Sequence, residues 1–230
     1  MNKKVLIAGA SRGLGLFLTQ RYLELGDTVF AGVRNTGAPH IAALAATYGG
    51  RLFPVEMDVS NTSSVTRAVT AVSEHTNTLD ILINNAGIHC ASSFAPLPEA
   101  DLDDCLAVYN VNAIGPLRVI KAFDNFLSTG ARIINISSES GSIGLSGRKT
   151  EFDYCMSKAA MNMSSKILQN GVADRGIKVL AIQPGWMRTD MGGTNADLDP
   201  YETACKLVDL FADYAGGAIF LDNDGTELVW

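Results

Sequence analysis

The sequence has few of the residues that mark metal sites, disulfide frameworks or anion-binding surfaces. Its four cysteines, Cys90, Cys105, Cys155 and Cys205, are scattered and form no Cys-x-x-Cys pair. This spacing argues against a zinc or disulfide framework and predicts reduced thiols in a cytoplasmic protein without a bound metal. The net charge of −6 gives no basic footprint for nucleic acid or for an anionic membrane, so we expect neither as a partner.

Long apolar runs are also missing. The first run, residues 4–8, is ended by Gly9 and Arg12, well below the length of a signal peptide. No stretch approaches the ~20 apolar residues that a membrane-spanning helix needs, so we expect neither a leader nor a span. The 230 residues, 47% hydrophobic but only 7% aromatic, fit one α/β domain with aliphatic strands and alanine-rich helices.

Short aliphatic runs alternate with helical patterns along the whole chain. We expect strands at residues 4–8, 28–34, 51–55, 79–83, 131–136, 177–182 and 218–221. We expect helices at residues 14–25, 41–48, 61–76, 102–127, 154–168 and 201–214, with Pro116 interrupting the fourth. This order predicts one domain, residues 1–230, of the Rossmann type: a doubly wound, mostly seven-stranded parallel sheet with helices on both faces. Ligands of such sheets bind at the carboxyl ends of the strands.

Glycines separate the first strand from the first helix. They form the pattern Gly9-x-x-x-Gly13-x-Gly15, and residues without Cβ let backbone amides approach a pyrophosphate at a helix N-terminus. Ser11 in this turn is a small residue that can touch phosphate. The position of the motif between strand and helix predicts dinucleotide binding.

The same turn also reads as a nucleophile elbow, Gly-x-Ser-x-Gly, centred on Ser11. A hydrolase of that kind needs an acid and then a histidine later in the chain. The histidines are His40, His75 and His89, all in the first half. A serine hydrolase using Ser11 is therefore kept only as a less favoured alternative.

Two arginines lie where a dinucleotide fold places the adenosine ribose. Arg34 follows the second strand, and Arg12 in the glycine turn can reach the same corner. An acidic residue there would suit a ribose 2′-hydroxyl, whereas arginine suits a 2′-phosphate, so NADP(H) is favoured over NAD(H). Asp58, before Val59, could accept from an adenine amino group or be an ordinary turn or capping residue.

Tyr154 and Lys158 are four residues apart at the start of a predicted helix, and residues with this spacing lie on one face. A neighbouring ammonium favours phenolate, so we expect Lys158 to lower the tyrosine pKa and make Tyr154 a proton donor or acceptor. Asn112 lies within the long helix near Pro116, where a kink would free backbone groups for water.

These motifs together resemble the short-chain dehydrogenase/reductase family over essentially the whole chain. The motifs are, in chain order, the glycine turn, Asp58-Val59, Asn84-Asn85-Ala86-Gly87, Asn112, Ser138, Tyr154-x-x-x-Lys158 and Pro184-Gly185. The segments 184–193 and 222–230 resemble the C-factor and sniffer-type carbonyl reductase branch. The resemblance implies an NADP(H)-dependent oxidoreductase that reduces a ketone or aldehyde, or oxidises the alcohol, by hydride transfer.

The resemblance also implies catalytic roles. Tyr154 would be the general acid or base, Ser138 would hold the carbonyl oxygen, Lys158 would lower the Tyr154 pKa and bind the nicotinamide ribose, and Asn112 would hold a water. The segment between Ser138 and Tyr154 is longer than in many relatives, so Ser137 or Ser140 is an alternative oxygen donor.

The remaining expectations concern the cofactor, the substrate and the assembly. The cofactor would contact Gly9, Ser11, Arg12, Gly13, Leu14, Gly15, Arg34, Asp58, Val59, Asn85, Ala86, Gly87, Tyr154, Lys158, Pro184, Gly185, Met187 and Thr189. A short substrate loop near residues 190–200 suggests an open site for varied carbonyls, which His89, Cys90 and Phe94 could line. Family members often form homodimers or homotetramers, which we expect here. A cofactor-binding signalling or scaffold protein of the same fold is the alternative function.

Overall fold

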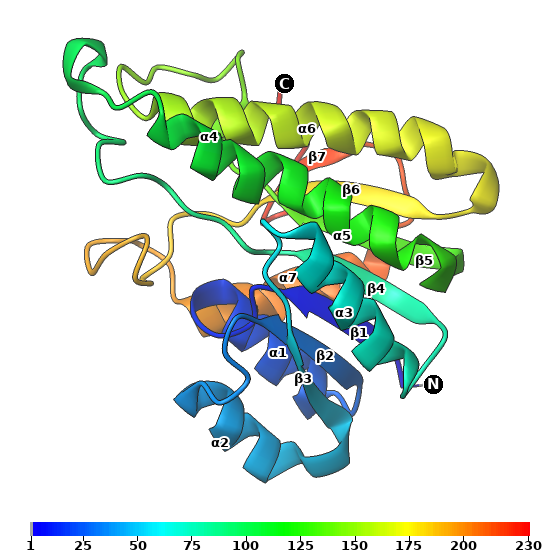
Figure 1. Cartoon of the computed structure of the whole chain (residues 1–230). Coiled ribbons are helices and arrows are strands. Elements are labelled where there is room, and N and C mark those ends of the chain that lie inside the picture. Colours follow the sequence, from blue (N-terminus) through cyan, green and yellow to red (C-terminus); the bar gives the residue numbers. More distant parts are fainter. Residues whose placement is uncertain (1) are drawn as a thin grey trace.

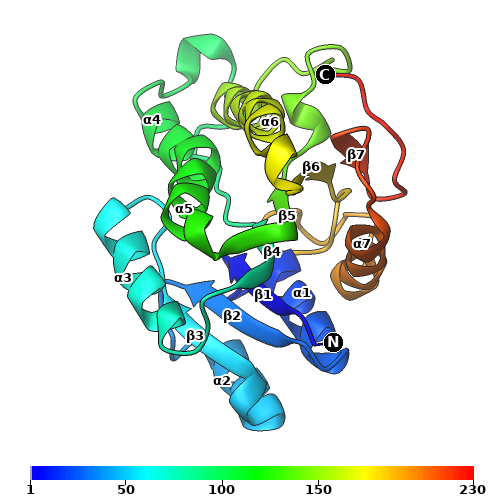
Figure 2. The ribbon, with the colours of Figure 1, turned by 90° about the vertical axis from the view of Figure 1, so that its right-hand side faces the viewer.

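The computed structural model describes residues 2–230 as one sheet covered by helices on both faces (Figures 1 and 2). The seven strands of this part of the chain are all parallel and run in the order β3-β2-β1-β4-β5-β6-β7. The predicted single Rossmann-type domain is therefore confirmed. The strand order reverses between β1 and β4, and a parallel sheet opens a crevice for ligands at this point.

The strands lie close to the predicted ranges. They are β1 (Lys4–Ala8), β2 (Thr28–Val33), β3 (Leu52–Glu56), β4 (Leu79–Asn84), β5 (Leu127–Ile136), β6 (Lys178–Gln183) and β7 (Phe220–Asp222). Only β5 differs by several residues at one end, because it begins at Leu127, within the region expected to be helical. Leu127 pairs with Leu79 before a shift in the β4–β5 register.

The helices also follow the predicted order. They are α1 (Gly13–Glu24), α2 (Pro39–Tyr48), α3 (Thr62–Ser73), α4 (Asp104–Tyr109), α5 (Gly115–Phe123), α6 (Phe152–Val172) and α7 (Pro200–Asp213). Short 3₁₀ turns lie at Gly49–Arg51, Leu97–Glu99, Asp124–Phe126, Glu139–Gly141 and Ala173–Arg175. The long helix expected over residues 102–127 is interrupted, since a π-helical turn, Asn110–Ile114, separates α4 from α5. Pro116 lies in the first turn of α5, directly after the π-helical turn.

Alternation along the strands separates the core into two layers. In β1, Val5 and Ile7 point into the layer beneath α1, α2 and α7, whereas Leu6 and Ala8 point into the layer beneath α3 and α5. All four side chains are buried, as expected of a strand covered on both faces. Figure 2 shows the sheet between these two groups of helices.

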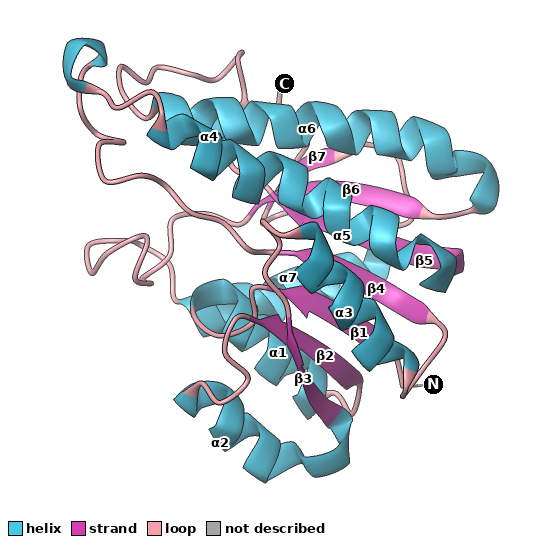
Figure 3. Cartoon of the chain, in the orientation of Figure 1, coloured by secondary structure: helices cyan, strands magenta, loops and turns pink. Residues whose placement is uncertain are grey.

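The loops that follow the strands gather at one edge of the sheet, on the left in Figures 1 and 3. The N-termini of α1 and α6 lie at the same edge. The sheet therefore brings together the glycine turn, the loop after β4, the serines after β5 and the segment after β6, which are far apart in sequence.

Candidate active site

The glycine turn is packed against the loop that follows β4. Gly9 has φ +85°, and a Cβ there would lie 2.7 Å from the Cα of Ala86. A Cβ on Gly15 would lie 2.2 Å from the Gly9 carbonyl oxygen and 2.4 Å from Nδ2 of Asn85. Asn85 Nδ2 in turn donates a 2.8 Å hydrogen bond to that carbonyl. Both glycines are needed because the backbone leaves no room for a side chain.

The N-terminus of α1 is open to an anion. Arg12 precedes the helix in an extended conformation, and within the described residues its side chain makes no capping hydrogen bond and the first turn has no acidic residue. Helix N-terminal amides without partners, together with the helix dipole, favour a negative charge. The turn thus has the close backbone approach and the free amides that a dinucleotide pyrophosphate requires.

Arg12 points across a groove to the segment after β6. Its Nη1 lies 3.1 Å from Oδ2 of Asp190, and both side chains are exposed. The groove, about 460 Å³, is lined by residues of α1, α2 and residues 188–190. The sequence predicted that Arg12 lies with Arg34 near the adenosine ribose site. In this structure Arg12 is paired with the carboxylate of Asp190.

Asp58 is held in a turn after β3. Its Oδ1 accepts hydrogen bonds from the backbone N–H of Ser60, at 2.9 Å, and from the Ser60 hydroxyl, at 2.7 Å. The Ser60 hydroxyl is the main cause that lowers the Asp58 pKa, and the charge of Arg34 contributes. Of the two interpretations left open for Asp58, the structure shows the turn residue directly.

The segment after β6 returns to the glycine turn. Gly185 has φ +90°, and a Cβ there would lie 2.3 Å from the Leu198 side chain. Met187 forms a bridge with Leu198, which fixes the start of the 190–200 segment. The side chain of Thr189 comes within 3.6 Å of the Cβ position of Gly13. Pro184-Gly185 and Thr189 are thus placed at the same crevice as the glycine turn.

Tyr154 and Lys158 lie on one face of α6, as predicted. The Lys158 Nζ is 5.5 Å from the centre of the Tyr154 ring. The ammonium is buried and donates a 2.7 Å hydrogen bond to the carbonyl oxygen of Ile136, at the end of β5. Burial lowers the pKa of Lys158 to about 8. The Cβ position of Gly87 is 3.8 Å from this Nζ, so the loop after β4 reaches the lysine as well.

The Tyr154 pKa shifts in the opposite direction to the expected one. Burial, followed by the negative charge of Glu139, raises the pKa of Tyr154 to about 12. The nearby Ser138 hydroxyl opposes this rise. The expectation of a lowered Tyr154 pKa is therefore wrong for the chain alone. The physical reason is that burial disfavours the charged phenolate and the negative charge of Glu139 adds to this effect.

The serines after β5 have different partners. Ser137 is buried and donates to Oδ1 of Asn162 at 2.5 Å, which directs its hydroxyl into the protein. The Ser138 hydroxyl lies 2.8 Å from Oε2 of Glu139 and 3.1 Å from Oγ of Ser140, so it can donate to either. Ser138 is the serine that affects the Tyr154 pKa, which favours it as the residue beside the phenol.

Asn112 links the loop after β4 to α6 from within the π-helical turn. Its Nδ2 donates to the Ile88 carbonyl at 2.8 Å and to Oγ of Ser157 at 3.0 Å, and its Oδ1 accepts from the Ile88 N–H at 2.9 Å. The side chain is fully buried. The Cβ position of Gly87 lies 3.6 Å from Oδ1, so Asn112 borders the same crevice as Lys158. π-helical turns occur frequently at functional sites.

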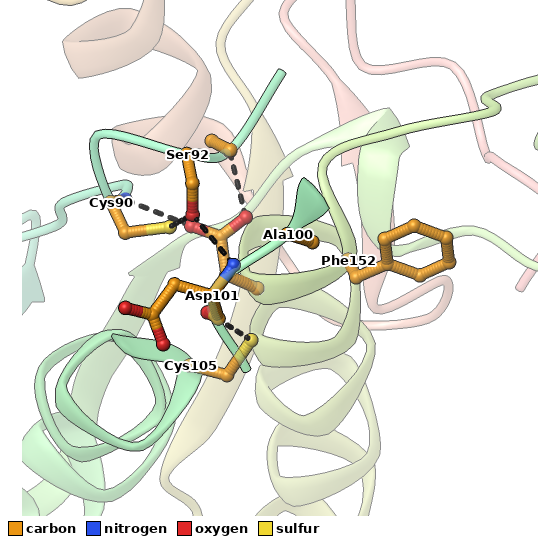
Figure 4. Close-up of a pocket in the computed structure, with 8 residues that line it drawn as sticks. Cys90, Ser92, Ala100, Asp101, Cys105 and Phe152 are labelled. Atoms are coloured by element: carbon orange, nitrogen blue, oxygen red, sulfur yellow. Dashed lines mark hydrogen bonds between the residues drawn. The ribbon is translucent and has the colours of Figure 1, made fainter. Parts of the chain in front are cut away.

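Sequence reasoning missed Asp153, which holds the loop after β4. Its buried carboxylate accepts from the Cys90 N–H at 2.8 Å and from the Ser93 hydroxyl at 2.7 Å. Asp153 also lines a small pocket between that loop, α4 and the start of α6, which Figure 4 shows with Cys90, Cys105 and Phe152 labelled. Of the residues expected to line a substrate pocket, Cys90 lines this one, whereas Phe94 is 66% exposed. Asp153 directly precedes Tyr154, and this position was the feature of the sequence that could have indicated its role.

Glu139 was also missed. It is bonded to Ser138 and to Arg148, and its charge acts on Tyr154. Its position directly after Ser138 could have indicated this.

None of the helices within residues 2–230 has the length and apolar character needed to cross a membrane.

Comparison with known proteins agrees with this arrangement. Residues 3–198 match the family model described as short chain dehydrogenase. The chain is 34% identical to C-signal of Myxococcus xanthus over 161 residues, which are 67% of this chain and 95% of that protein. Carbonyl reductase Sniffer of D. melanogaster superposes with a TM-score of 0.93 at 29% identity, covering 100% of both chains. NADPH-bound carbonyl reductase from chicken fatty liver superposes with a TM-score of 0.89 at 33% identity, covering 100% of this chain and 99% of the other.

The matched range and the shared fold agree along the chain, and the predicted resemblance to the C-factor and sniffer-type branch is confirmed. This protein belongs to the short-chain dehydrogenase family of oxidoreductases.

Proposed function

We propose that the protein is an NADP(H)-dependent carbonyl reductase, in which Tyr154 gives a proton to the oxygen of a ketone or aldehyde. In the direction of alcohol oxidation Tyr154 would accept that proton. The observation that carries the proposal is the meeting of Tyr154, Lys158 and Ser138 at the crevice where the glycine turn fits a dinucleotide. The NADPH-bound carbonyl reductase that shares this fold supports the same reaction class.

The reduced nicotinamide supplies the hydride when it is bound. The residues of the chain supply the rest. Because the pKa of Tyr154 is about 12, the phenol is protonated at neutral pH and can donate. Ser138 would be a second donor to the same oxygen, which gains negative charge in the transition state. Lys158, with a pKa of about 8, is mostly charged at pH 7 and stabilises negative charge that develops on the phenol.

Asn112 would keep the loop after β4 against α6 and, as the family resemblance implies, hold a water that links Lys158 to solvent. Fixing the loop also fixes Gly87 beside the lysine. Holding donor, acceptor and acid in one geometry removes orientational entropy from the barrier.

The cofactor would lie along the carboxyl edge of the sheet. The pyrophosphate would meet the amides of the glycine turn, and Arg12 and Arg34 would bind a 2′-phosphate, so we propose NADP(H) over NAD(H). The adenine would lie near Asp58-Val59, and the nicotinamide near Tyr154 and Lys158. The residues proposed to contact the cofactor are Gly9, Ser11, Arg12, Gly13, Leu14, Gly15, Arg34, Asp58, Val59, Asn85, Ala86, Gly87, Tyr154, Lys158, Pro184, Gly185, Met187 and Thr189.

We also propose that two or four copies associate through α4 and α6. Leu106 on α4 and Met163 and Ile167 on α6 are 62–73% exposed, and α4 packs beside α6. Association would remove these apolar side chains from water. Light scattering of the purified protein at several concentrations tests this; a strictly monomeric mass would contradict it.

The two alternative functions, scaffold protein and serine hydrolase, predict different behaviour from a carbonyl reductase. A signalling or scaffold protein, as the name of the C-signal relative suggests, would bind cofactor without turnover. A hydrolase would use Ser11, but in residues 2–230 no hydrogen bond joins Ser11 to a histidine, and the family is one of oxidoreductases.

The test is a fluorescence titration with NADPH and NADH, followed by a panel of aldehydes, ketones and quinones with each cofactor. We expect tighter binding of NADPH and reduction of several carbonyls, in keeping with the short segment 190–200. Absence of nicotinamide binding would contradict the proposal, and binding without turnover of any carbonyl would favour the scaffold alternative.

A further inference from the structure

A carboxylate borders the place where the carbonyl oxygen would bind. Glu139 directly follows Ser138 and opens the 3₁₀ turn Glu139–Gly141. Its Oε2 is 2.8 Å from the Ser138 hydroxyl, and Nε2 of Gln183 approaches the same oxygen at 3.5 Å. The Glu139 side chain is 42% exposed, so beside Ser138 it is accessible from solvent.

The charge of this carboxylate acts on the phenol as well. After burial, Glu139 is the largest cause that raises the Tyr154 pKa. The Ser138 hydroxyl bonds to Glu139 and also acts on the phenol, so Ser138 connects the carboxylate to the proposed acid. The two proposed hydrogen-bond donors, Ser138 and Tyr154, therefore share one anionic neighbour.

The charge of Glu139 is only partly neutralised. Nη2 of Arg148 lies 2.6 Å from Oε1 of Glu139, while Nη1 of the same guanidinium bonds to Glu151. Two carboxylates thus share one cation, and the cluster has a net charge of −1. Burial acts to raise the Glu139 pKa, but the bonds from Ser138 and Arg148 outweigh it and lower the pKa, so the carboxylate is charged at neutral pH.

We propose that Glu139 is a specificity-determining residue, which favours carbonyl substrates that carry a positive charge near the carbonyl and disfavours those that carry a carboxylate. The proposal rests on the carbonyl reductase function proposed above. The negative potential at the wall of the crevice attracts a cationic substituent and repels an anionic one. Neutral carbonyls are not affected in this way.

The test compares three para-substituted benzaldehydes with NADPH: the trimethylammonio, tert-butyl and carboxylate compounds. The first two have nearly the same shape and differ in charge. We measure kcat/KM of each charged compound relative to the tert-butyl compound, in the wild type and in each variant. Because the ratios are compared between variants, the different intrinsic reactivities of the aldehydes cancel.

Glu139→Gln keeps the size and one acceptor oxygen but removes the charge. We expect it to lower the cation-to-neutral ratio and to raise the anion-to-neutral ratio, each about 10-fold, as expected for charges separated by several ångströms in a partly solvated site. Glu74→Gln removes the same charge at the end of α3 and should leave both ratios unchanged.

Arg148→Gln is the reciprocal variant, because it exposes the charge of Glu139. It should raise the cation-to-neutral ratio, in the opposite direction to Glu139→Gln. Unchanged ratios in both variants, or equal losses for all three aldehydes, would overturn the proposal and leave Glu139 a structural residue. Failure of the wild type to reduce even the neutral aldehyde and the wider carbonyl panel would instead reject the carbonyl reductase function, and with it this inference.

Discussion

The Nζ of Lys158 lies 5.5 Å from the centre of the Tyr154 ring but donates its hydrogen bond to the carbonyl of Ile136. The two side chains are close, yet each has its pKa shifted toward the neutral form by burial, to about 12 for the phenol and about 8 for the ammonium. The chain alone therefore holds a protonated phenol beside a cation that is easily neutralised. Proton donation by Tyr154 fits this state.

Replacing Lys158 should change how stability depends on pH. The pKa of Lys158 falls from 10.5 to about 8 on folding. Between these values the unfolded chain binds more protons than the folded one, so the cost of burying the ammonium is full below pH 8 and vanishes above pH 10.5. Relative to Lys158→Met, the wild type should gain up to about 3 kcal/mol of unfolding free energy between pH 7 and pH 10.

Urea unfolding at several pH values measures this difference. Lys166→Met, at an exposed position of α6, is the control and should follow the wild-type pH dependence. Loss of the hydrogen bond to Ile136 adds a constant to the unfolding free energy of Lys158→Met at every pH. The difference in pH dependence between wild type and variant therefore reports the titration of Lys158 alone. Parallel curves for the wild type and Lys158→Met would refute the burial cost.

The serines after β5 should separate activity from stability. Ser138→Ala removes a proposed donor to the carbonyl oxygen and should lower kcat/KM about 10²-fold with little change in stability. Ser137→Ala leaves Oδ1 of Asn162 without its buried donor and should cost about 1–3 kcal/mol of stability with a small kinetic effect. Steady-state kinetics and urea unfolding of both variants provide the check. The reverse pattern would make Ser137 the oxygen donor.

The pair formed by Arg12 and Asp190 should compete with the cofactor phosphate. In Asp190→Asn the guanidinium is free, so NADPH should bind up to about 5-fold more tightly, the range expected from an exposed ion pair. Arg12→Gln should weaken NADPH binding, and NADH affinity should change little in either variant. Titrations with both cofactors test this. Equal changes for NADPH and NADH would show that Arg12 does not contact a 2′-phosphate.

Gly15 should not tolerate a side chain. In Gly15→Ala the new methyl would meet the Gly9 carbonyl and the Asn85 amide, which should cost about 1–3 kcal/mol and abolish tight nucleotide binding. Gly171→Ala is the matched control, because a Cβ there meets nothing within 4 Å and the residue lies in α6. It should raise stability by about 0.5–1 kcal/mol. Thermal unfolding with and without NADPH distinguishes the two, and equal effects would contradict the close packing.

The fold was predictable because its signals are local. The short run of residues 4–8, apolar from Val5 to Ala8, predicted β1 with its observed bounds. The helix expected from residue 61 begins at Thr62, where the Asn61 side chain accepts from Ser64 N–H as a cap. The end of the long helix was misplaced, since an apolar residue such as Leu127 suits a buried helix or a strand equally well. Pairing with β4 decides between them, and such pairing is not local.

The same limit applies to the candidate site. The spacing of Tyr154 and Lys158 predicted their common face, but not the Ile136 carbonyl that holds the ammonium. The contacts of Asp153 with the loop after β4 and of Arg12 with Asp190 join positions 60 to 178 residues apart. Side-chain pairs of this kind depend on the packed fold and on burial, which spacing along the chain does not report.

The most direct test of the central claim is the replacement of Tyr154 by phenylalanine, which removes the proposed proton donor. With NADPH and an aldehyde that the wild type reduces, Tyr154→Phe should lower kcat by roughly 10²-fold or more, because the alkoxide has no proton source. NADPH affinity should stay within a few-fold, and Tyr109→Phe, at an exposed position of α4, should behave as the wild type. Undiminished oxidation of NADPH by Tyr154→Phe would contradict the account.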